Sequence, residues 1–354
     1  MKLRTTNLQI QTSNHTQPGL ISLPPLTSQP PRRSGALART IGAATVLFLG
    51  GVSALAAGDD PFVKREPPAV VGRWDLVVRG SEREYPSWLE VSQSGYRTLV
   101  GSYVGQFGSA RPIGQIEEDQ GRIHFALPPQ WERRPNDVVF DAKLEGDVLR
   151  GEVTDDQGKR IHFEGRRAPS LQREQPPKWG PPIELFNARD LAGWKPRHPE
   201  AKHGWLVQGG LLTNAIPGND LLTERNFTDF KLHAEFRYPK KSNSGIYLRG
   251  RYEVQIEDNF GLPPDAHRIG GVYGFLTPSV NAAKTPGEWQ TMEITLVGRL
   301  VTVVLNGERI IERQTIPGIT GGALDSDEAK PGPILLQGDH GPIAFRKLIL
   351  TPAK

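Results

Sequence analysis

Short runs of alternating hydrophobic and polar residues fill the segment 70–167, and turn-forming pairs such as Ser94-Gly95 and Gln120-Gly121 separate them. Alternation with a period of two, interrupted by turn signals, is typical of antiparallel strands joined by hairpins. About seven such strands can close into a small barrel or pack as a small sandwich. We therefore predict an antiparallel β domain with strands at Trp74–Val78, Trp88–Val91, Arg97–Val104, Arg122–Ala126, Val138–Ala142, Val148–Val153 and Arg160–Glu164.

The alternating pattern resumes at residue 183 and continues to the C-terminus. Asn306-Gly307 between two alternating runs is a strong signal for a tight β-hairpin. So many short strands in one segment favour a sandwich of two large antiparallel sheets, which makes the whole folded chain all-β. We expect its strands at Glu184–Phe186, Trp205–Gln208, Gly210–Thr213, Leu221–Glu224, Phe230–Tyr238, Ser244–Arg249, Tyr252–Ile256, Thr291–Val297, Leu300–Leu305, Glu308–Gln314, Ile334–Gln337 and Ile343–Leu350.

A proline-rich segment at 168–182 separates the two patterned regions. Five of its residues are proline, and none of it alternates. Proline-rich segments are stiff and extended, and they commonly join domains. We therefore predict a linker at 168–182 between a small barrel-like domain of unknown role at 70–167 and a sandwich at 183–354.

The N-terminal residues 1–56 have the organisation of a secretory signal. Residues 41–57 carry no charge, follow Arg32, Arg33 and Arg39, and end in the small-residue site Ala54-Leu55-Ala56. A basic region, an apolar region and an A-x-A site in this order direct export and cleavage. The long region before them is rich in Pro, Ser, Thr and Gln, which favours disorder. We expect an exported protein, periplasmic or extracellular, cleaved near Ala56, with no transmembrane span in the mature form. The alternative is an uncleaved N-terminal membrane anchor.

Charge and cysteine content exclude several classes of function. The formal net charge of the chain is +4, but residues 1–58 hold five basic residues and no acid, so the remainder carries 38 basic and 39 acidic residues. A near-neutral folded part argues against a nucleic-acid partner, which would require a basic face. The chain has no cysteine, which excludes disulfides, zinc–thiolate sites and cysteine nucleophiles. No feature of the sequence predicts an oligomeric state.

The segment 243–258 predicts two neighbouring strands with one apolar and one polar face. Side chains alternate between faces along a strand, so positions 246, 248, 254 and 256 would face the core. A solvent-exposed outer sheet face is the plain alternative for the polar side. However, its residues are planar hydrogen-bonding types that suit sugar hydroxyls: Tyr247, Arg249, Glu253, Gln255 and Glu257, with Asp258 just past the strand.

Polar residues recur around glycines in a second segment, 333–346. Gln337, Asp339, His340 and Arg346 gather there. Three of them also have a structural alternative: a histidine can be structural, an Asp in a turn can cap it, and an outward Arg can pair with a surface acid. Together with the first segment, they are candidates for a saccharide site.

Several motifs, in order, resemble the 3-keto-disaccharide hydrolase domain family over residues 183–352. They are Phe186-Asn-Ala-Arg-Asp-Leu-Ala-Gly-Trp194, Asn243-Ser-Gly-Ile-Tyr-Leu-Arg-Gly250, Tyr252-Glu-Val-Gln-Ile256, Gly271-Val-Tyr-Gly274, Pro286-Gly-Glu-Trp-Gln290 and Leu336-Gln-Gly-Asp-His-Gly341. The resemblance implies a concanavalin A-like β-sandwich (jelly roll) of two curved sheets with a concave groove. One departure is Gly338, which stands between Gln337 and Asp339 where the family's motif usually has no such residue.

The resemblance also implies a chemistry, a base-assisted elimination followed by hydration. A ketone at C3 of a sugar acidifies the proton on C2, so a base can remove it and the glycosidic oxygen can leave C1. On this basis the catalytic candidates are Glu253, His340 and Asp258. The sugar-binding candidates are Tyr247, Arg249, Gln255, Gln337 and Arg346. A divalent metal ion is a possible cofactor, with Glu253, Asp339 and His340 as its ligands.

Two other functions fit the same sequence. A non-catalytic carbohydrate-binding module can use the same sandwich, because fold alone does not set function. Alternatively, the domain at 70–167 binds the ligand, and the sandwich serves as its scaffold. Convergence of Glu253 and His340 over one groove would favour an enzyme, whereas an aromatic platform without such a pair would favour a binding module.

Overall fold

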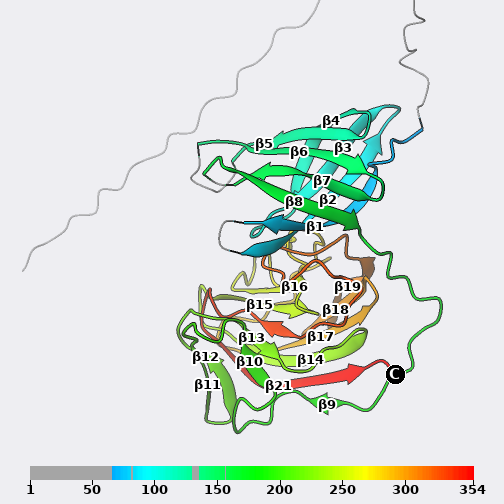
Figure 1. The fold of residues 1–354 in the computed structure, drawn as a ribbon. Helices are drawn as coiled ribbons and strands as arrows, with labels where there is room; N and C mark the ends of the chain where they lie inside the picture. Colours follow the sequence, from blue (N-terminus) through cyan, green and yellow to red (C-terminus); the bar gives the residue numbers. More distant parts are fainter. Residues whose placement is uncertain (1–65, 81–82, 130–134, 156) are drawn as a thin grey trace, which may run out of the picture. The chain divides into compact units, whose positions relative to one another are not determined.

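The computed structural model describes residues 66–80, 83–129, 135–155 and 157–354 (Figure 1). These residues form an all-β protein with 21 strands and no helix, as the alternation predicts. The predicted signal segment 1–56 lies outside the described residues. In the described part of the chain, no helix is long and apolar enough to cross a membrane.

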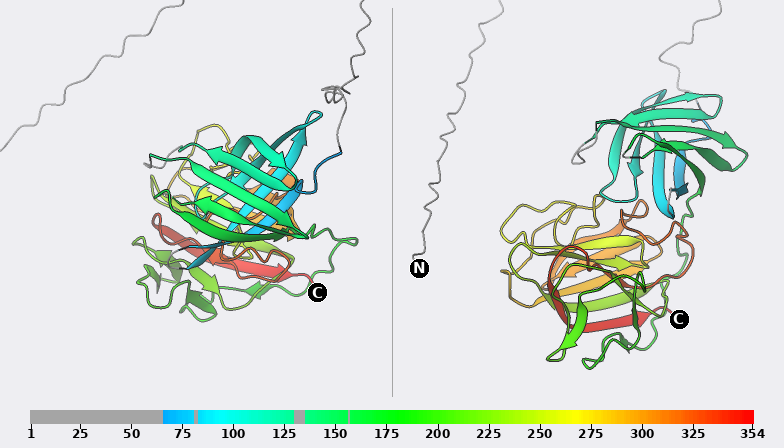
Figure 2. Two further views of the ribbon diagram at one scale, coloured as in Figure 1. Left: turned by 45° about the horizontal axis from the view of Figure 1, so that its top comes forward. Right: turned by 60° about the vertical axis from the view of Figure 1, so that its left-hand side comes forward.

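The first eight strands form a closed barrel in which each strand pairs with the next and β1 pairs with β8. Front and back strands cross at an angle in Figure 2, as closure of a barrel requires. Seven of the strands match the predicted ones, and β4 is additional. The strands are β1 (Gly72–Arg79), β2 (Glu84–Ser94), β3 (Thr98–Val104), β4 (Arg111–Asp119), β5 (Arg122–Leu127), β6 (Val138–Glu145), β7 (Val148–Thr154) and β8 (Arg160–Arg167).

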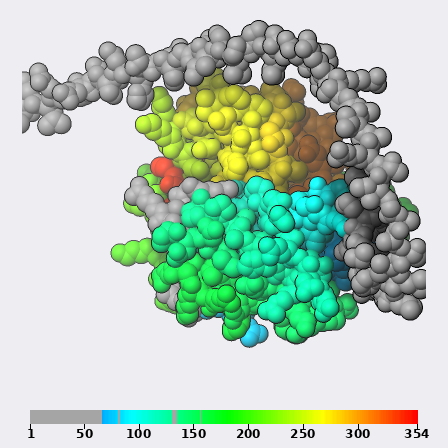
Figure 3. All heavy atoms as spheres, turned by 90° about the horizontal axis from the view of Figure 1, so that it is seen from above, coloured from blue at the N-terminus to red at the C-terminus, as the bar shows by residue number. Residues whose placement is uncertain are grey.

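Side chains fill the interior of this barrel. The Phe140 ring stacks against Phe125 and packs tilted against Phe163, with 4.6 Å between ring centroids in each pair. Trp74 is fully buried in the same cluster. The residues of these strands are cyan to green in Figure 3. An interior filled in this way is a packed core, which does not favour the barrel as the ligand-binding unit.

The second domain has two antiparallel sheets with an apolar core between them. The five-stranded sheet has the order β10-β13-β20-β15-β16. The eight-stranded sheet has the order β11-β12-β21-β14-β17-β18-β19, with β9 paired to β21. Its strands are β9 (Ile183–Glu184), β10 (Trp194–Pro196), β11 (Trp205–Gln208), β12 (Leu211–Asn214), β13 (Leu221–Thr223), β14 (Phe230–Arg237), β15 (Asn243–Leu248), β16 (Tyr252–Glu257), β17 (Gln290–Val297), β18 (Leu300–Leu305), β19 (Glu308–Thr315), β20 (Leu335–Leu336) and β21 (Ile343–Pro352).

The sandwich thus has all twelve predicted strands, and β10 is additional. The predicted core positions are correct: Ile246, Leu248, Val254 and Ile256 lie in the core between the sheets. The predicted hairpin is also present, since Asn306 and Gly307 join β18 to β19 with positive φ angles of 53° and 87°. The jelly-roll connectivity stays a prediction.

The described residues of the barrel and the sandwich belong to one compact unit, so the two are packed together. Trp88 and Val104 of the barrel belong to the core cluster of the sandwich, and the Trp88 ring meets Phe275 edge-on at 5.3 Å. The Ser326 hydroxyl donates a hydrogen bond to the Leu76 carbonyl at 2.5 Å. The predicted linker lies along this unit, because Gly180 donates its N–H to the Pro352 carbonyl.

Candidate active site

A pocket of about 520 Å³ lies against the five-stranded sheet. Strands β15 and β16 form one wall. Three loops form other walls: the loop after β10, the loop before β13 and the loop after β20. The barrel contributes two residues from the β3–β4 loop. The residues that line the pocket are Phe107, Gly108, Arg197, Asp220, Asn243, Tyr247, Glu253, Gln255, Tyr273, Gly321, Gly322, Gln337, Asp339 and His340.

Glu253 lies in the wall of this pocket because the alternation of β16 turns it away from the core. Its neighbours in sequence, Tyr252 and Val254, are fully buried on the core side. Glu253 itself is only 4% exposed. It packs over Gly245 of β15, where an added Cβ would lie 2.4 Å from the Glu253 Oε1 atom. A side chain at 245 would therefore displace the carboxyl group from this position.

The Glu253 carboxyl group shares a hydrogen-bond network with Tyr247, its cross-strand partner. The Tyr247 hydroxyl lies 2.9 Å from both Glu253 Oε2 and the Gly321 carbonyl oxygen. The hydroxyl has one proton and can donate it to either oxygen, and donation to Glu253 Oε2 favours the ionised carboxylate. Burial raises the pKa of Glu253 to about 8, against the lowering effect of the Tyr247 hydrogen bond. The result is a carboxyl group that exchanges its proton near neutral pH.

His340 and Asp339 lie in the loop after β20 and form the exposed side of the pocket. His340 Nδ1 lies 2.5 Å from Asp339 Oδ1, and both side chains are about half exposed. This hydrogen bond raises the pKa of His340, burial opposes the rise, and the charges of Asp339 and Glu253 add to it. In turn, the charge of His340 lowers the pKa of Glu253. The two groups therefore lie near enough to influence each other's protonation.

Gly338, the departure from the family's motif, has a structural explanation. An added Cβ at this position would lie 2.3 Å from the Asn219 carbonyl oxygen and 2.6 Å from Trp205 Nε1. The Gly338 N–H donates to Asp220 Oδ1 at 3.0 Å. The extra residue thus joins the His340 loop to the segment before β13.

Arg197 and Asp220 are functional candidates that the sequence did not indicate. Arg197 Nη1 lies 3.0 Å from Asp220 Oδ2 and donates to the Gly322 carbonyl oxygen at the same distance. Arg197 Nη2 donates to the Ala323 carbonyl at 3.2 Å. The guanidinium group is therefore held rigidly in the pocket wall as a fixed positive charge. Neither residue belongs to a motif or to the polar face of a strand pair, so only the tertiary fold brings them to the site.

Gln255 and Gln337 supply the remaining predicted hydrogen-bonding groups of the pocket. Gln255 is 2% exposed, and its Oε1 accepts a hydrogen bond from the Ile256 N–H at 3.2 Å. Gln337 is 9% exposed, and its buried Oε1 has no hydrogen-bond partner among the described residues. An unpaired buried acceptor is costly unless a ligand completes it. Gln337 is thus suited to accept a hydrogen bond from a bound hydroxyl group.

Three predicted residues lie elsewhere, which corrects the sequence-based expectation. Arg249 is fully buried and donates to the Tyr252 hydroxyl at 2.8 Å, because its φ of 54° places it in the β15–β16 turn. Arg346 is on β21 of the other sheet, paired with Glu235 at 2.5 Å. Asp258 accepts the Lys241 N–H at 2.6 Å, so it fixes a turn. None of the three lines the pocket.

The predicted metal ligands do not form a recognisable metal site. Among the residues that the structure describes, no group of three or more His, Cys, Asp or Glu is arranged to hold a metal ion. Asp339 and His340 are bonded to each other, and Glu253 is bonded to Tyr247. The predicted set of Glu253, Asp339 and His340 therefore does not fit a metal ion in this arrangement.

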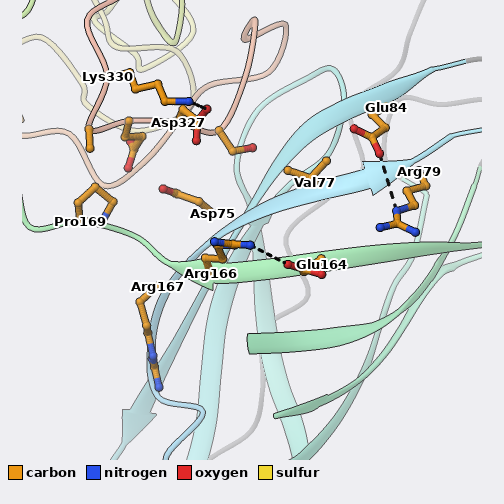
Figure 4. A pocket seen from close by; sticks show the side chains of 13 residues that line it. Asp75, Val77, Arg79, Glu84, Glu164, Arg166, Arg167, Pro169, Asp327 and Lys330 are labelled. Atoms are coloured by element: carbon orange, nitrogen blue, oxygen red, sulfur yellow. Dashed lines mark hydrogen bonds and ion pairs between the residues drawn. The ribbon is translucent and has the colours of Figure 1, made fainter. Parts of the chain in front are cut away.

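Another hollow, of about 530 Å³, is lined by charged side chains that pair among themselves (Figure 4). Arg79 pairs with Glu84 at 3.7 Å, and Lys330 pairs with Asp327 at 2.7 Å. Asp75 on β1 lies beside the loop that carries Lys330. None of the sequence-predicted site residues lines this hollow.

A comparison with curated proteins found no match. Similar solved structures include a candidate glycosyl hydrolase from Parabacteroides distasonis, 30% identical, TM-score 0.42, covering 51% of this chain and 92% of that chain. A second from the same organism is 20% identical, TM-score 0.42, covering 49% and 94%. An inactivated mutant β-agarase B in complex with agaro-octaose is 11% identical, TM-score 0.34, covering 52% and 97%.

The model of one protein family matches residues 181–351. This range coincides with the sandwich and with the segment whose motifs resemble the 3-keto-disaccharide hydrolase domain. This domain of the chain matches the family described as 3-keto-alpha-glucoside-1,2-lyase-like.

Proposed function

We propose that this protein cleaves 3-keto-glycosides by base-assisted elimination and hydration. The observation that carries the proposal is the convergence of two proton-transfer groups in one pocket. Glu253 is buried with a pKa of about 8, and His340 faces the same space with a raised pKa. The family match of residues 181–351 supports a carbohydrate-acting enzyme, and the position of the two groups supports this mechanism.

In the first half of the reaction, ionised Glu253 removes the proton from C2 of the 3-keto sugar. The electron pair of the C2–H bond moves toward the C3 carbonyl and forms an enolate. The enolate then expels the glycosidic oxygen from C1, and protonated His340 donates its proton to that oxygen. The products are a 1,2-unsaturated 3-keto sugar and the free alcohol. In the second half, water adds to C1 and gives up a proton to His340, while Glu253 returns its proton to C2. Both residues regain their starting forms, and the net reaction is hydrolysis.

Arg197 would stabilise the negative charge that develops on the C3 oxygen. Its guanidinium group is fixed by three hydrogen-bond acceptors, so it does not have to reorganise as charge develops. Gln337 and Gln255 would orient the hydroxyl groups of the sugar. Asp339 would hold His340 in one orientation and favour its charged form.

A purely binding function is less well supported. A carbohydrate-binding module needs no proton-transfer groups, and burial of an unneeded carboxyl group lowers stability. Glu253 and His340 line the same pocket although the burial of Glu253 lowers the stability of the fold.

The test is to incubate purified protein with 3-keto-trehalose or a 3-keto-glucoside and to measure the released sugar. We expect turnover by the wild type and a loss of about 10²–10⁴-fold in E253Q, the range typical for removal of a general base. E257Q is the matched control, because Glu257 lies on the same strand but does not line the pocket. A parallel reaction with EDTA tests for metal dependence. A folded E253Q that retains wild-type turnover would remove Glu253 from the mechanism.

A further inference from the structure

The barrel forms part of the wall of the candidate active site. Phe107 and Gly108 come from the β3–β4 loop, residues 105–110, and line the same pocket as Glu253. This part of the barrel has no counterpart in the matched family range 181–351. Its role therefore cannot be taken from the family.

Backbone contacts fix this loop against the sandwich. The Gly322 N–H donates to the Gln106 carbonyl at 2.9 Å. Gly321 packs directly against Gly108, since an added Cβ at 321 would lie 2.2 Å from the Gly108 carbonyl oxygen. Such a close approach is possible only without a side chain at 321. The position of the neighbouring Phe107 is consequently set by the fold.

Phe107 is 60% exposed although the loop on either side of it is packed. Val104 is fully buried and Ala110 packs against the core of the sandwich. The Phe107 ring thus stands free at the edge of a polar pocket. Aromatic rings provide large, rigid contact area, and ligand sites combine such rings with a few polar groups.

A second hollow of about 420 Å³ adjoins the Glu253 pocket. The two hollows share Phe107, Arg197, Asp220 and Asp339 in their walls. The barrel contributes further residues to the second hollow, including Tyr85 and Pro86. Both hollows are within the size range of small-ligand sites.

We infer that the second hollow is a subsite for the leaving sugar of a disaccharide and that Phe107 is its aromatic platform. The inference rests on the proposed function, because it requires the 3-keto sugar to lie beside Glu253. The shared wall between the hollows is then where the scissile oxygen lies. Asp339 belongs to that wall, and its partner His340 is the proposed proton donor to this oxygen. The barrel thereby determines specificity for the leaving group.

The test compares a 3-keto-disaccharide with methyl 3-keto-glucoside, whose leaving group is too small to reach the second hollow. We expect F107A to lower kcat/KM on the disaccharide about tenfold more than on the methyl glycoside, as expected for loss of one ring contact. F107Y should restore the preference. Y96A is the matched control, since Tyr96 is an aromatic residue of the same barrel, 52% exposed, that lines neither hollow.

An equal loss on both substrates, or none on either, would overturn the subsite. If the wild type cleaves neither substrate, the proposed function fails, and calorimetric titration with trehalose decides the subsite separately. Binding of trehalose that is detectable in the wild type and weaker in F107A would support the subsite. Equal binding by both proteins, or no binding by the wild type, would overturn it.

Discussion

Replacement of Tyr247 by phenylalanine tests whether Glu253 acts as a base with an elevated pKa. The Tyr247 hydroxyl is 2.9 Å from Glu253 Oε2, and its hydrogen bond lowers the pKa of the carboxyl group while burial raises it to about 8. A hydrogen bond to a charged group contributes about 1.5–3 kcal/mol, and about 1.4 kcal/mol corresponds to one pH unit. In Y247F we therefore expect the pKa of Glu253 to rise by at least about one, to about 9.

The sign of the effect on activity follows from the ionised form being the base. With a pKa of about 8, about a tenth of Glu253 is ionised at pH 7, and with a pKa of about 9, about a hundredth is. The ratio of kcat/KM between Y247F and the wild type should then be about 0.1 at pH 6–7. The ratio should rise to about 0.5 at pH 9, as Glu253 ionises in both proteins. The titration of His340 is common to both proteins and cancels in this ratio.

The assay is kcat/KM of both proteins from pH 6 to pH 9 on methyl 3-keto-glucoside. Y273F is a control, because Tyr273 also lines the pocket but no hydrogen bond from its side chain to Glu253 occurs in the described structure. A ratio for Y247F that stays constant with pH would mean that Tyr247 affects the pocket by another route. A ratio above one at low pH would mean that the hydrogen bond raises the pKa of Glu253, opposite to the expected sign.

Four further predictions follow from the same structure. E253Q should be more stable than the wild type at pH 8 but not at pH 4. The reason is that a Glu253 pKa raised to about 8 lowers the stability of the wild type as the pH rises from about 4.5 to 8, by up to about 1.4 kcal/mol per pH unit. Equal melting temperatures of the two proteins at both pH values would contradict this. D75N should also be more stable than the wild type at high pH, because burial and the neighbouring charge of Glu328 raise the pKa of Asp75 to about 8. The gain in Tm of D75N over the wild type must be larger at pH 8 than at pH 5. G245A should retain the circular dichroism of the wild type but lose most of its turnover, since the added Cβ would displace Glu253; undiminished kcat would show that the displacement does not matter. If the leader directs export, mass spectrometry of the mature protein should find its N-terminus just after Ala56, and an intact leader would favour the membrane anchor instead.

The polar face of β15 and β16 could be predicted because alternation is a local property of strands. Tyr247, Glu253 and Gln255 reach the pocket for the same geometric reason that places Ile246 and Val254 in the core. Any error of one position in register would have reversed the faces of both strands. The prediction that these residues lie on the polar face therefore depended only on the alternation within the two strands.

Arg249 and Arg346 show where this local rule stops. Arg249 follows β15 directly, but its positive φ of 54° begins the turn, so its side chain no longer follows the alternation of the strand. Arg346 does point away from the core while Phe345 is buried, as alternation predicts. It nevertheless lies on the eight-stranded sheet, where β21 pairs with β14. Alternation gives the face of a strand but does not say which sheet the strand joins.

The residues that sequence reasoning missed lie outside regular patterns. Arg197 directly follows the short strand β10, and Asp220 directly precedes β13. Strands β10 and β13 are neighbours in the five-stranded sheet, which brings the two side chains within 3.0 Å. Phe107 comes from the other domain altogether. A pairing between strands distant in sequence, or a contact between domains, leaves no periodic signal in the chain.

The burial of Glu253 connects the fold to the proposed chemistry. An exposed glutamate has a pKa near 4.3 and is therefore a weak base. The C2 proton is only weakly acidic even beside a ketone, so its removal requires a stronger base. Two glycines, 245 and 322, let the strand pair and the loop close tightly on the Glu253–Tyr247 pair, which excludes water from the carboxyl group. The loss of hydration raises its pKa to about 8 and so increases its strength as a base. The same burial lowers the stability of the fold at neutral pH, so a site that only bound sugars would gain nothing from it.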